Sequence, residues 1–350
     1  MHVIIWIIIA LAIFILLLII LRCITNRPKT YLKPDMTGKV IIVTGSNSGI
    51  GKVAALTLLS RGARVIFASR DESKTQAVID SIKDIKLRQN ASYIKLDISS
   101  FESINLFVRE FKENYPKCDI LINNAGATID KFELKDKIES TIMTNHIGPV
   151  CLTALLLDSI NPKGKVINVS SMAHKWVTSK DLNQFFSDDD FIKMKNSYDL
   201  LKIYYISKLG NIYHTKTLDM VIKLRNLEIK TAALNPGLVY TNLFSTRRYS
   251  SFVNKIKFFC FIPVWWLFSK DVEMGAQTTL HLAYIDYDEM NSGAYFSDCK
   301  EEKLGELPSD QKTCIQFMKY TRDLIKNNIR DIPGELSEYF KSLKSEMEID

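Results

Sequence analysis

The stretch VIIVTGSNSGIG, residues 40–51, decides the fold class. Its first five residues form an apolar, β-branched run that is typical of a buried strand, and the glycines follow at once. Glycine at these positions lets the chain turn tightly, lets backbone approach a pyrophosphate and lets the next helix pack on the strand. The stretch therefore predicts a dinucleotide-binding loop. The residues assigned to the cofactor here are Gly45, Ser46, Asn47, Ser48, Gly49, Ile50 and Gly51.

Similar apolar runs recur along the chain, with helix-length segments between them. Near-continuous apolar strands alternating with helices are what a parallel sheet requires when helices cover both of its faces. Residues 39–330 are therefore predicted to form one α/β domain with a doubly wound parallel sheet of about seven strands, a Rossmann fold. The predicted strands are Val40–Thr44, Arg64–Ser69, Tyr93–Leu96, Ile120–Asn123, Lys165–Val169, Lys230–Leu234 and Ala294–Phe296.

The N-terminal segment is apolar throughout. Val3–Leu21 contains no charge, amide or proline, and nineteen helical residues extend about 28 Å, close to the thickness of a bilayer core. This predicts a transmembrane anchor over residues 1–21, followed by a linker over residues 22–38. The basic excess after the span places the catalytic domain in the cytosol. The endoplasmic reticulum suits such an anchor best, with mitochondrial or lipid-droplet membranes as alternatives.

Overall charge and cysteine usage exclude several classes of protein. The chain has 46 basic and 39 acidic residues, a net charge of +7, without the basic block that nucleic-acid binding favours. Its six cysteines are scattered, and no CxxC pair or histidine spacing suits a metal. We expect reduced thiols, no nucleic-acid partner and no metal site.

The spacing TGxxxGxG differs from the common G-x-G-x-x-G and resembles the cofactor loop of the short-chain dehydrogenase/reductases. Further motifs of that family follow in order over residues 39–241: Asp97, Asn123-Asn124-Ala125-Gly126, Asn145, Ser171, the YxxxK pair Tyr204 and Lys208, and Asn235-Pro236-Gly237 with Thr241. The further cofactor contacts that this resemblance implies are Asp97, Ile98, Asn124, Ala125, Gly126, Tyr204, Lys208, Pro236, Gly237, Val239 and Thr241. Asp97 has the alternative role of a helix N-cap.

Tyr204 and Lys208 lie four residues apart, so on a helix they share one face. A phenol with a pKa near 10 is a poor acid or base at pH 7, and a neighbouring ammonium group favours the phenolate. The resemblance implies that Lys208 also bonds the nicotinamide ribose, that Ser171 bonds the substrate oxygen and that Asn145 supports a water-linked proton path. Ser170 is the alternative to Ser171, and Asn145 could instead cap a local turn.

The choice of cofactor depends on the end of the second strand. A site that prefers NAD usually has an acid there, whereas the 2′-phosphate of NADP needs a cation. Here the residues are Ser69 and Arg70, with Asp71 one step later. We therefore predict NADP(H), with Ser69 and Arg70 in its site, against the alternative that Arg70 is a solvated surface charge.

Two segments are expected to form the substrate side. Residues 172–203 are a long insertion before Tyr204, part of which should loop over the active site. The segment 242–270 contains the apolar run Phe258–Phe268, which is either a buried core helix or a substrate-binding helix at the membrane surface. Trp265 and Trp266 suit the second interpretation, and we predict that they contact substrate together with Ser171. Residues 331–350 are expected to be a charged tail.

The sequences NVSSMAH, YYISKLGN, WWLF and SGAYFSDC resemble one branch of the family, the membrane-anchored, NADPH-preferring retinol dehydrogenases. This resemblance implies a hydrophobic alcohol or aldehyde as substrate, with retinal reduction favoured, taken from the lipid bilayer. It also implies that the helices with Asn145 and Tyr204 could pair two subunits into a homodimer. Reductases of steroid ketones or of long-chain, lipid-derived aldehydes share these motifs. A non-catalytic, membrane-tethered NADP-binding protein is the alternative outside enzymes.

Overall fold

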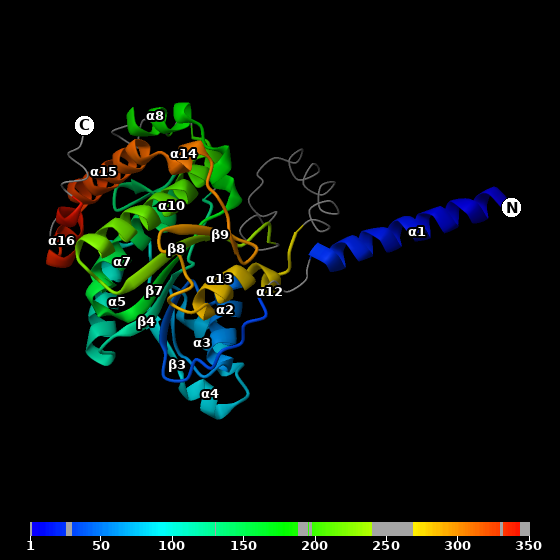
Figure 1. Ribbon diagram of the computed structural model, residues 1–350, viewed down its shortest axis with the longest axis horizontal. Helices are drawn as coiled ribbons and strands as arrows, with labels where there is room; N and C mark the ends of the chain where they lie inside the picture. The colour runs from blue at the N-terminus through cyan, green and yellow to red at the C-terminus, as the bar shows by residue number, and fades with distance from the viewer. Residues whose placement is uncertain are drawn as a thin grey trace.

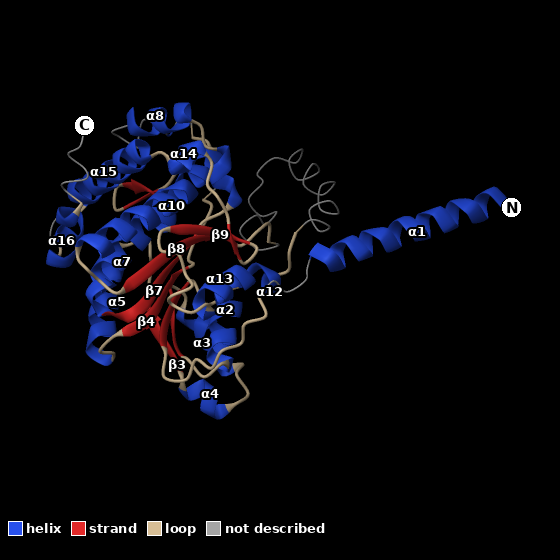
Figure 2. Ribbon diagram, viewed as in Figure 1, coloured by secondary structure: helices blue, strands red, loops and turns tan. Residues whose placement is uncertain are grey.

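Eight strands form one sheet at the centre of the protein (Figure 2). The computed structural model describes residues 2–25, 30–129, 131–187, 195, 198–239, 269–329 and 332–343. In spatial order the strands run β10-β9-β8-β7-β4-β1-β2-β3, all parallel except for the pair β9 and β10. Their bounds are β1 (Val40–Thr44), β2 (Arg64–Ser69), β3 (Ala91–Lys95), β4 (Cys118–Asn123), β7 (Ile160–Val169), β8 (Ile229–Asn235), β9 (Ala294–Ser297) and β10 (Lys300–Glu301).

The predicted doubly wound fold is confirmed. β1 and β2 have the predicted bounds because each is a continuous apolar run with a turn residue after it. β7 differs, since it begins at Ile160 rather than Lys165. The intervening Asn161–Gly164 resembles a turn in sequence, and Lys163 does adopt a positive φ of 62°. Ile160 pairs with Cys118 and Lys165 with Ile120, so the strand continues across an irregularity where the register shifts.

Helices cover both faces of the sheet (Figure 1). One face carries α2 (Gly49–Ser60), α3 (Glu72–Asp80) and α13 (Gln277–Tyr284). The other carries α5 (Phe101–Asn114), α7 (Gly148–Leu156) and α10 (Leu200–Leu224). Alternate residues of each strand point to opposite faces, so Ile42 joins the core under α5, α7 and α10, whereas Ile41 and Val43 join the core under α2 and α13.

The remaining elements are short or peripheral. Around the sheet lie α4 (Ile85–Gln89), the hairpin β5 (Leu134–Lys135) and β6 (Ile138–Glu139), α6 (Ser140–Ile142), the π-helical turn η1 (Met143–Ile147), the 3₁₀ turns η2 (Leu157–Ser159) and η3 (Met172–Trp176), and α8 (Ser179–Ser187). Toward the C-terminus follow α12 (Val272–Gly275), α14 (Glu306–Ser309), α15 (Gln311–Asn328) and α16 (Gly334–Ser342).

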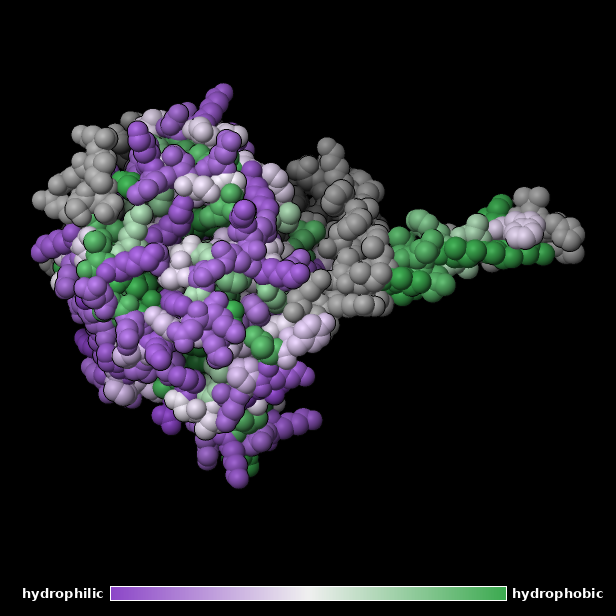
Figure 3. Space-filling model, viewed as in Figure 1, coloured by the Kyte–Doolittle hydropathy of each residue, from purple (hydrophilic) through white to green (hydrophobic). Residues whose placement is uncertain are grey.

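Helix α1 (His2–Thr25) projects away from the domain (Figure 1). Its surface is apolar along most of its length, in contrast to the largely hydrophilic face of the domain (Figure 3). Ile7, Phe14 and Leu17, for example, are all more than half exposed. Such a continuous exposed apolar surface requires an apolar environment to cover it.

A second apolar helical stretch has a different explanation. Among the described residues, Ser140–Ser159 is the run long and apolar enough to cross a membrane. However, 94% of it is buried inside the domain, where it comprises α6, η1, α7 and η2. Its hydropathy therefore reflects its position in the core, between the sheet and the C-terminal helices.

The described part of the insertion after Ser171 includes a helix that lies away from the catalytic residues. Its helix α8 lies instead against α15, where the Phe185 ring is 5.0 Å from that of Tyr320 and 5.9 Å from that of Phe317. Trp176, nearer the start of the insertion, stays close to the catalytic helix, with its ring 5.1 Å from that of Tyr205. The aromatic residues of α8 therefore stabilise the packing of the C-terminal part of the chain.

The carboxyl ends of the parallel strands meet at one edge of the sheet. Successive connections run toward β3 on one side of β1 and toward β8 on the other, so the direction of winding reverses between β1 and β4. In open α/β sheets the ligand binds outside the carboxyl ends of the strands at this reversal. The predicted functional residues follow β1, β3, β4, β7 and β8, which brings them to this edge.

Candidate active site

The glycine-rich loop has the backbone conformation that its sequence predicts. Gly45 and Gly49 have φ values of 67° and 54°, in the left-handed region that glycine adopts without strain. Gly51 has no room for a side chain, because a Cβ there would lie 2.3 Å from Nδ2 of Asn124 and 2.6 Å from the Gly45 carbonyl oxygen. The loop is therefore folded tightly against the end of β4.

Thr44 connects this loop to the next part of the site, a role that the sequence analysis missed. Its hydroxyl donates to the Ile122 carbonyl at 3.3 Å and accepts from the N–H groups of Asn124 at 3.0 Å and Ala125 at 2.9 Å. Nδ2 of Asn124 donates back to the Thr44 carbonyl at 2.8 Å. The sequence did contain a signal for this role of Thr44, because Thr44 is the first residue of the motif TGxxxGxG.

The loop fits the pyrophosphate of a dinucleotide. Ser46 is buried, and its hydroxyl has no hydrogen-bond partner within the described part of the chain. Ser48 is the N-cap of α2, but its side chain makes no capping bond. The first N–H groups of a helix attract an anion through their unpaired donors and the helix dipole. These groups together would hold the phosphates, with Asn47 and Ile50 contributing backbone to the same loop.

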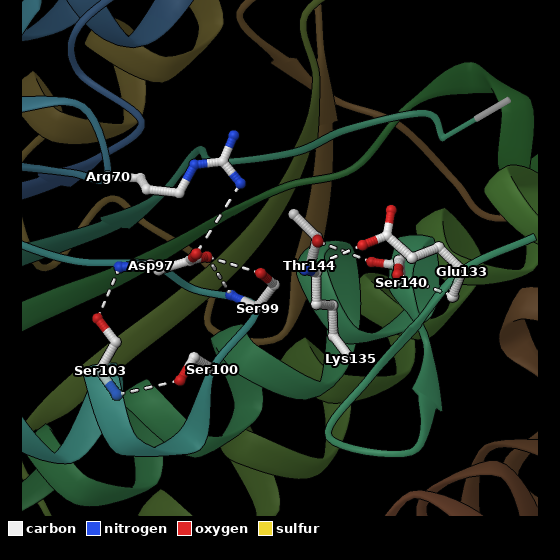
Figure 4. Close-up of polar contacts among 9 residues, drawn as sticks. All are labelled: Arg70, Asp97, Ser99, Ser100, Ser103, Glu133, Lys135, Ser140 and Thr144. Atoms are coloured by element: carbon white, nitrogen blue, oxygen red, sulfur yellow. Dashed lines mark hydrogen bonds and ion pairs between the residues drawn. The ribbon is translucent and has the colours of Figure 1, made fainter. Parts of the chain in front are cut away.

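The end of β2 presents a cation (Figure 4). Arg70 has a side chain that is 73% exposed, and its Nη1 lies 3.8 Å from Oδ2 of Asp97. The following Asp71 is directed away from this position, because it caps α3 through the Lys74 N–H at 3.0 Å and pairs with the Lys74 ammonium at 2.6 Å. Hydrogen bonds to Lys74 lower the pKa of Asp71 to about 2. The adjacent Ser69 is buried, with its hydroxyl bonded to that of Thr75.

Asp97, a predicted cofactor contact, organises the chain after β3 (Figure 4). Its Oδ1 accepts from the N–H of Ser99 at 3.0 Å and from the Ser99 hydroxyl at 2.6 Å. Ile98 is buried next to it, and a Cβ on Gly148 would lie 2.0 Å from the Ile98 carbonyl oxygen. The cap of α5 is Ser100 and not Asp97.

Lys135 is a second cation near Arg70, one that the sequence did not indicate. It lies on the β5–β6 hairpin and pairs with Glu133 at 2.9 Å (Figure 4). The hydrogen bond to Glu133 raises the pKa of Lys135, and the charges of Asp97 and Arg70 act on it in opposite directions. The hairpin is joined to α5 by Asp136, which accepts from the Phe101 N–H at 2.8 Å.

Ser171, Tyr204 and Lys208 come together at the ends of β7 and α10. The side chains of Ser171 and Tyr204 are hydrogen bonded to each other. Nζ of Lys208 lies 5.8 Å from the centroid of the Tyr204 ring and donates to the Val169 carbonyl at 3.1 Å. The neighbouring Ser170 has a different contact, since its hydroxyl donates to the Lys208 main-chain carbonyl at 2.6 Å. This arrangement leaves Ser171 as the hydroxyl beside Tyr204.

The pKa of Tyr204 differs from the expectation that Lys208 would lower it. Burial raises the pKa of Tyr204 to about 12, and the hydrogen bond from Ser171 offsets only part of this effect. Burial also lowers the pKa of Lys208 to about 8. Desolvation prevails because both groups are buried and because the ammonium group donates to a backbone carbonyl. In this state the Tyr204 phenol is protonated at neutral pH.

Asn145 lies in the π-helical turn η1, where its side chain faces the loop after β4. Its Oδ1 accepts from the Ala127 N–H at 2.7 Å, and its Nδ2 donates to the Ala127 carbonyl at 2.9 Å and to the Ser207 hydroxyl at 3.0 Å. A Cβ on Gly126 would lie 3.4 Å from both Oδ1 of Asn145 and Nζ of Lys208. Asn145 therefore joins the loop after β4 to the catalytic helix, and the extra residue of a π turn frequently marks a functional site.

The loop after β8 is held by a second carboxamide, Asn235, whose sequence motif did not by itself predict this role. Oδ1 of Asn235 accepts from the N–H groups of Met172 at 3.1 Å and Gly237 at 3.0 Å. It thereby joins the chain after β7 to the chain after β8. Pro236 is buried, and Gly237 has a φ of 86°.

Most of the apolar segment predicted to bind substrate lies outside the described residues. Val239 pairs with Lys270 in a parallel bridge, so the two ends of the intervening segment are adjacent. Thr241, Trp265, Trp266 and the remainder of residues 240–268 lie outside the described residues. Their predicted contacts with cofactor and substrate stay predictions.

Comparison with protein families and known proteins shows the family to which the chain belongs. Residues 39–179 match the family model described as short chain dehydrogenase. Human retinol dehydrogenase 11 is 35% identical over 271 residues, which cover 76% of this chain and 79% of the relative. The chloroplastic short-chain dehydrogenase TIC 32 A of Brassica napus is 34% identical, over 82% and 88% of the two chains. Human retinol dehydrogenase 12 is 33% identical, over 83% and 87%.

Solved structures show the same fold. An uncharacterised protein of Mycobacterium paratuberculosis superposes with a TM-score of 0.64 at 26% identity, over 86% of this chain and 98% of the other. A short-chain dehydrogenase of Burkholderia cenocepacia, crystallised in complex with NADP, has a TM-score of 0.56 at 19% identity, over 75% and 97%. The second likeness concerns the fold alone.

Proposed function

The chain belongs to the short-chain dehydrogenase/reductase family and is an oxidoreductase that acts on CH–OH groups, and we propose that it reduces hydrophobic aldehydes with NADPH, retinal foremost. The observation that carries the proposal is the buried Tyr204 with Ser171 beside it and Lys208 Nζ 5.8 Å from its ring centroid, and burial raises the pKa of Tyr204. These residues lie at the sheet edge that binds the nicotinamide dinucleotide. Retinol dehydrogenases among the relatives support the choice of substrate class.

Tyr204 is the proton donor in this reaction. When bound, the reduced nicotinamide supplies the hydride to the carbonyl carbon. Ser171 holds the carbonyl oxygen by a hydrogen bond, and Tyr204 donates its phenolic proton to that oxygen. Because burial raises the pKa of Tyr204 to about 12, the protonated phenol that reduction needs is the resting form at pH 7. Oxidation of an alcohol would need the phenolate, which burial disfavours.

Lys208 and Asn145 support the proton transfer. The Lys208 ammonium is largely charged at pH 7, since the pKa of Lys208 is about 8, and it stabilises the phenolate that remains after Tyr204 has given up its proton. Asn145 keeps the loop after β4 close to this pair through its bonds to Ala127. In this proposal Asn145 also supports the water-linked path by which the proton returns to Tyr204.

The preference for NADP(H) follows from the charges at the end of β2. Arg70 is exposed, so its guanidinium can reach a ribose 2′-phosphate, whereas Lys135 on the facing hairpin is paired with Glu133. Asp71 is the nearest acid in sequence of the kind that a ribose hydroxyl would need, but its side chain is occupied as the cap of α3. The end of β2 should therefore bind a ribose with a 2′-phosphate, as in NADP(H), more tightly than the unmodified ribose of NAD(H).

The substrate reaches the site from a membrane in this proposal. Helix α1 spans the bilayer, and its apolar surface supports that role. At its C-terminal end, Nη2 of Arg22 pairs with Oδ1 of Asp271 at 2.6 Å, and Nη1 donates to the Ser269 carbonyl at 2.9 Å. Ser269 directly follows the apolar segment predicted to bind substrate. The anchor thus ends beside Ser269 and Asp271, with the catalytic domain on the cytosolic side, most simply at the endoplasmic reticulum.

A substrate panel tests the proposal. Full-length protein in detergent is incubated with all-trans-retinal, long-chain aldehydes, steroid ketones and a short water-soluble aldehyde, and NADPH oxidation is followed. We expect kcat/KM to be highest for retinal and lowest for the short aldehyde. Turnover of long-chain aldehydes or steroid ketones without retinal would keep the mechanism and change the substrate. Binding of NADPH without turnover of any carbonyl would favour a non-catalytic protein instead.

A further inference from the structure

The outer face of the catalytic helices is covered by the end of the same chain. Helices α15 and α16 lie on α10 and α7, on the side remote from the sheet (Figure 1). The buried residues of α15 recur at helical spacing, as one apolar stripe: Cys314, Phe317, Met318, Thr321, Leu324 and Ile325. From the segment expected to be a charged tail, α16 buries Leu336, Tyr339 and Phe340. This is the face on which a second subunit was expected to dock.

Three elements approach closely at Gly210 of α10. A Cβ at this position would lie 2.8 Å from Nδ1 of His146 and 2.9 Å from Cε1 of Phe317. The Phe317 ring stands edge-on to the His146 ring, with centroids 5.2 Å apart. The π turn with His146, the catalytic helix and α15 are therefore in direct contact, and a shift of α15 must displace His146.

A buried polar contact joins α15 to this turn. The Thr321 hydroxyl and Nε2 of His146 are 2.8 Å apart, and both residues are almost fully buried. Burial lowers the pKa of His146 to about 3, so the ring is neutral and has one donor nitrogen and one acceptor nitrogen. With Nε2 as the acceptor, Thr321 donates to it, and the proton lies on Nδ1.

Asn211 of α10 shares a backbone acceptor with the catalytic lysine. Within the described part of the chain, Nδ1 of His146 and Oδ1 of Asn211 are both buried without a hydrogen-bond partner. Nδ2 of Asn211 donates to the Val169 carbonyl at 3.1 Å, the same oxygen that accepts from Lys208 Nζ at 3.1 Å.

We propose that Thr321 and His146 are positioning residues for Asn145 and Lys208. We also propose that α15 and α16, from the same chain, support the catalytic helices in the way that a second subunit could. His146 directly follows Asn145, and it packs against α10 at Gly210, two residues after Lys208. Thr321 therefore fixes both catalytic groups from outside the site. Because α15 and α16 occupy the outer face of α7 and α10, the catalytic site is complete in a monomer. The positioning role rests on the proposed function of this site.

Replacing Thr321 with Val tests the positioning role, because it removes the hydroxyl at nearly constant volume. We expect kcat for carbonyl reduction to fall roughly ten-fold. The Kd of NADPH and the KM of the aldehyde should stay near the wild-type values, and T321S should restore kcat. A wild-type kcat in T321V contradicts the proposal. So does a parallel loss of kcat, cofactor binding and thermal stability in both variants, which would indicate a structural role alone.

The proposed monomeric state can be tested without measuring enzymatic turnover. Light scattering of the full chain in detergent should give a protein mass of one chain, and cross-linking should give no inter-chain links through α7 or α10. A dimer with links between these helices would overturn this part of the inference. If wild-type protein reduces no carbonyl, the proposed function fails, whereas wild-type turnover with an unaffected T321V variant counts against the inference alone.

Discussion

Replacing Tyr204 with Phe is expected to lower kcat for aldehyde reduction roughly a thousand-fold, because the variant has no proton to give to the carbonyl oxygen. The ring stays in place, so the apolar contacts of this buried side chain are kept. Removing the hydroxyl also removes the bond to Ser171, which then retains its contact with the Ala173 N–H at 3.2 Å. Cofactor binding should therefore be preserved, and NADPH fluorescence measures it directly.

Tyr205 provides the matched control for this variant. It is the next residue of the same helix, its ring packs against Trp176, and it is only partly buried. Y205F removes an identical hydroxyl from a position that does not face Ser171, so its kcat should lie within a few-fold of the wild type. If Y204F and Y205F retained similar activity, Tyr204 would not be the proton donor.

Arg70→Asp should reverse the preference between the two nicotinamide cofactors. The substitution removes the cation proposed to bond the 2′-phosphate and places a carboxylate there. Loss of a charge-assisted bond together with the new repulsion should weaken NADPH binding roughly a hundred-fold. NADH has no 2′-phosphate and should lose little affinity. The two dissociation constants, measured at one ionic strength, give the ratio.

The control for Arg70 lies on the same strand. Arg64 is exposed at the amino end of β2, whereas Arg70 follows its carboxyl end, where the cofactor binds. R64D changes the net charge of the protein equally and should leave both dissociation constants almost unchanged. Equal losses of NADPH and NADH affinity in R70D would mean that Arg70 stabilises the site in general and does not select a cofactor.

Local sequence signals were sufficient for the framework of the fold. The strands around the glycine loop are short apolar runs that end at glycine, serine or asparagine, and so β1 and β2 could be placed to the residue. The helical spacing of Tyr204 and Lys208, together with the position of Ser171 after β7, predicted the proximity that the structure has. These relations depend on neighbouring residues and on the known geometry of one helix or strand.

Features that depend on distant residues could not be predicted in this way. The C-terminal helix α16 contains many charges, which hid the spacing of Leu336, Tyr339 and Phe340 on its buried face. The contact of α8 with α15 joins residues more than a hundred positions apart. The pKa of Tyr204 depends on burial, and burial is a property of the assembled fold and not of the YxxxK spacing.

The most direct test of NADPH-linked carbonyl reduction follows the hydride itself. Full-length protein in detergent is incubated with all-trans-retinal and NADPH in which deuterium replaces both hydrogens at C4 of the nicotinamide. The alcohol product is then analysed by mass spectrometry. We predict retinol with one deuterium on its carbinol carbon, formed in an amount equal to the NADP⁺ produced. Unlabelled retinol, or no alcohol from any hydrophobic aldehyde while NADPH remains bound, would contradict the proposed function.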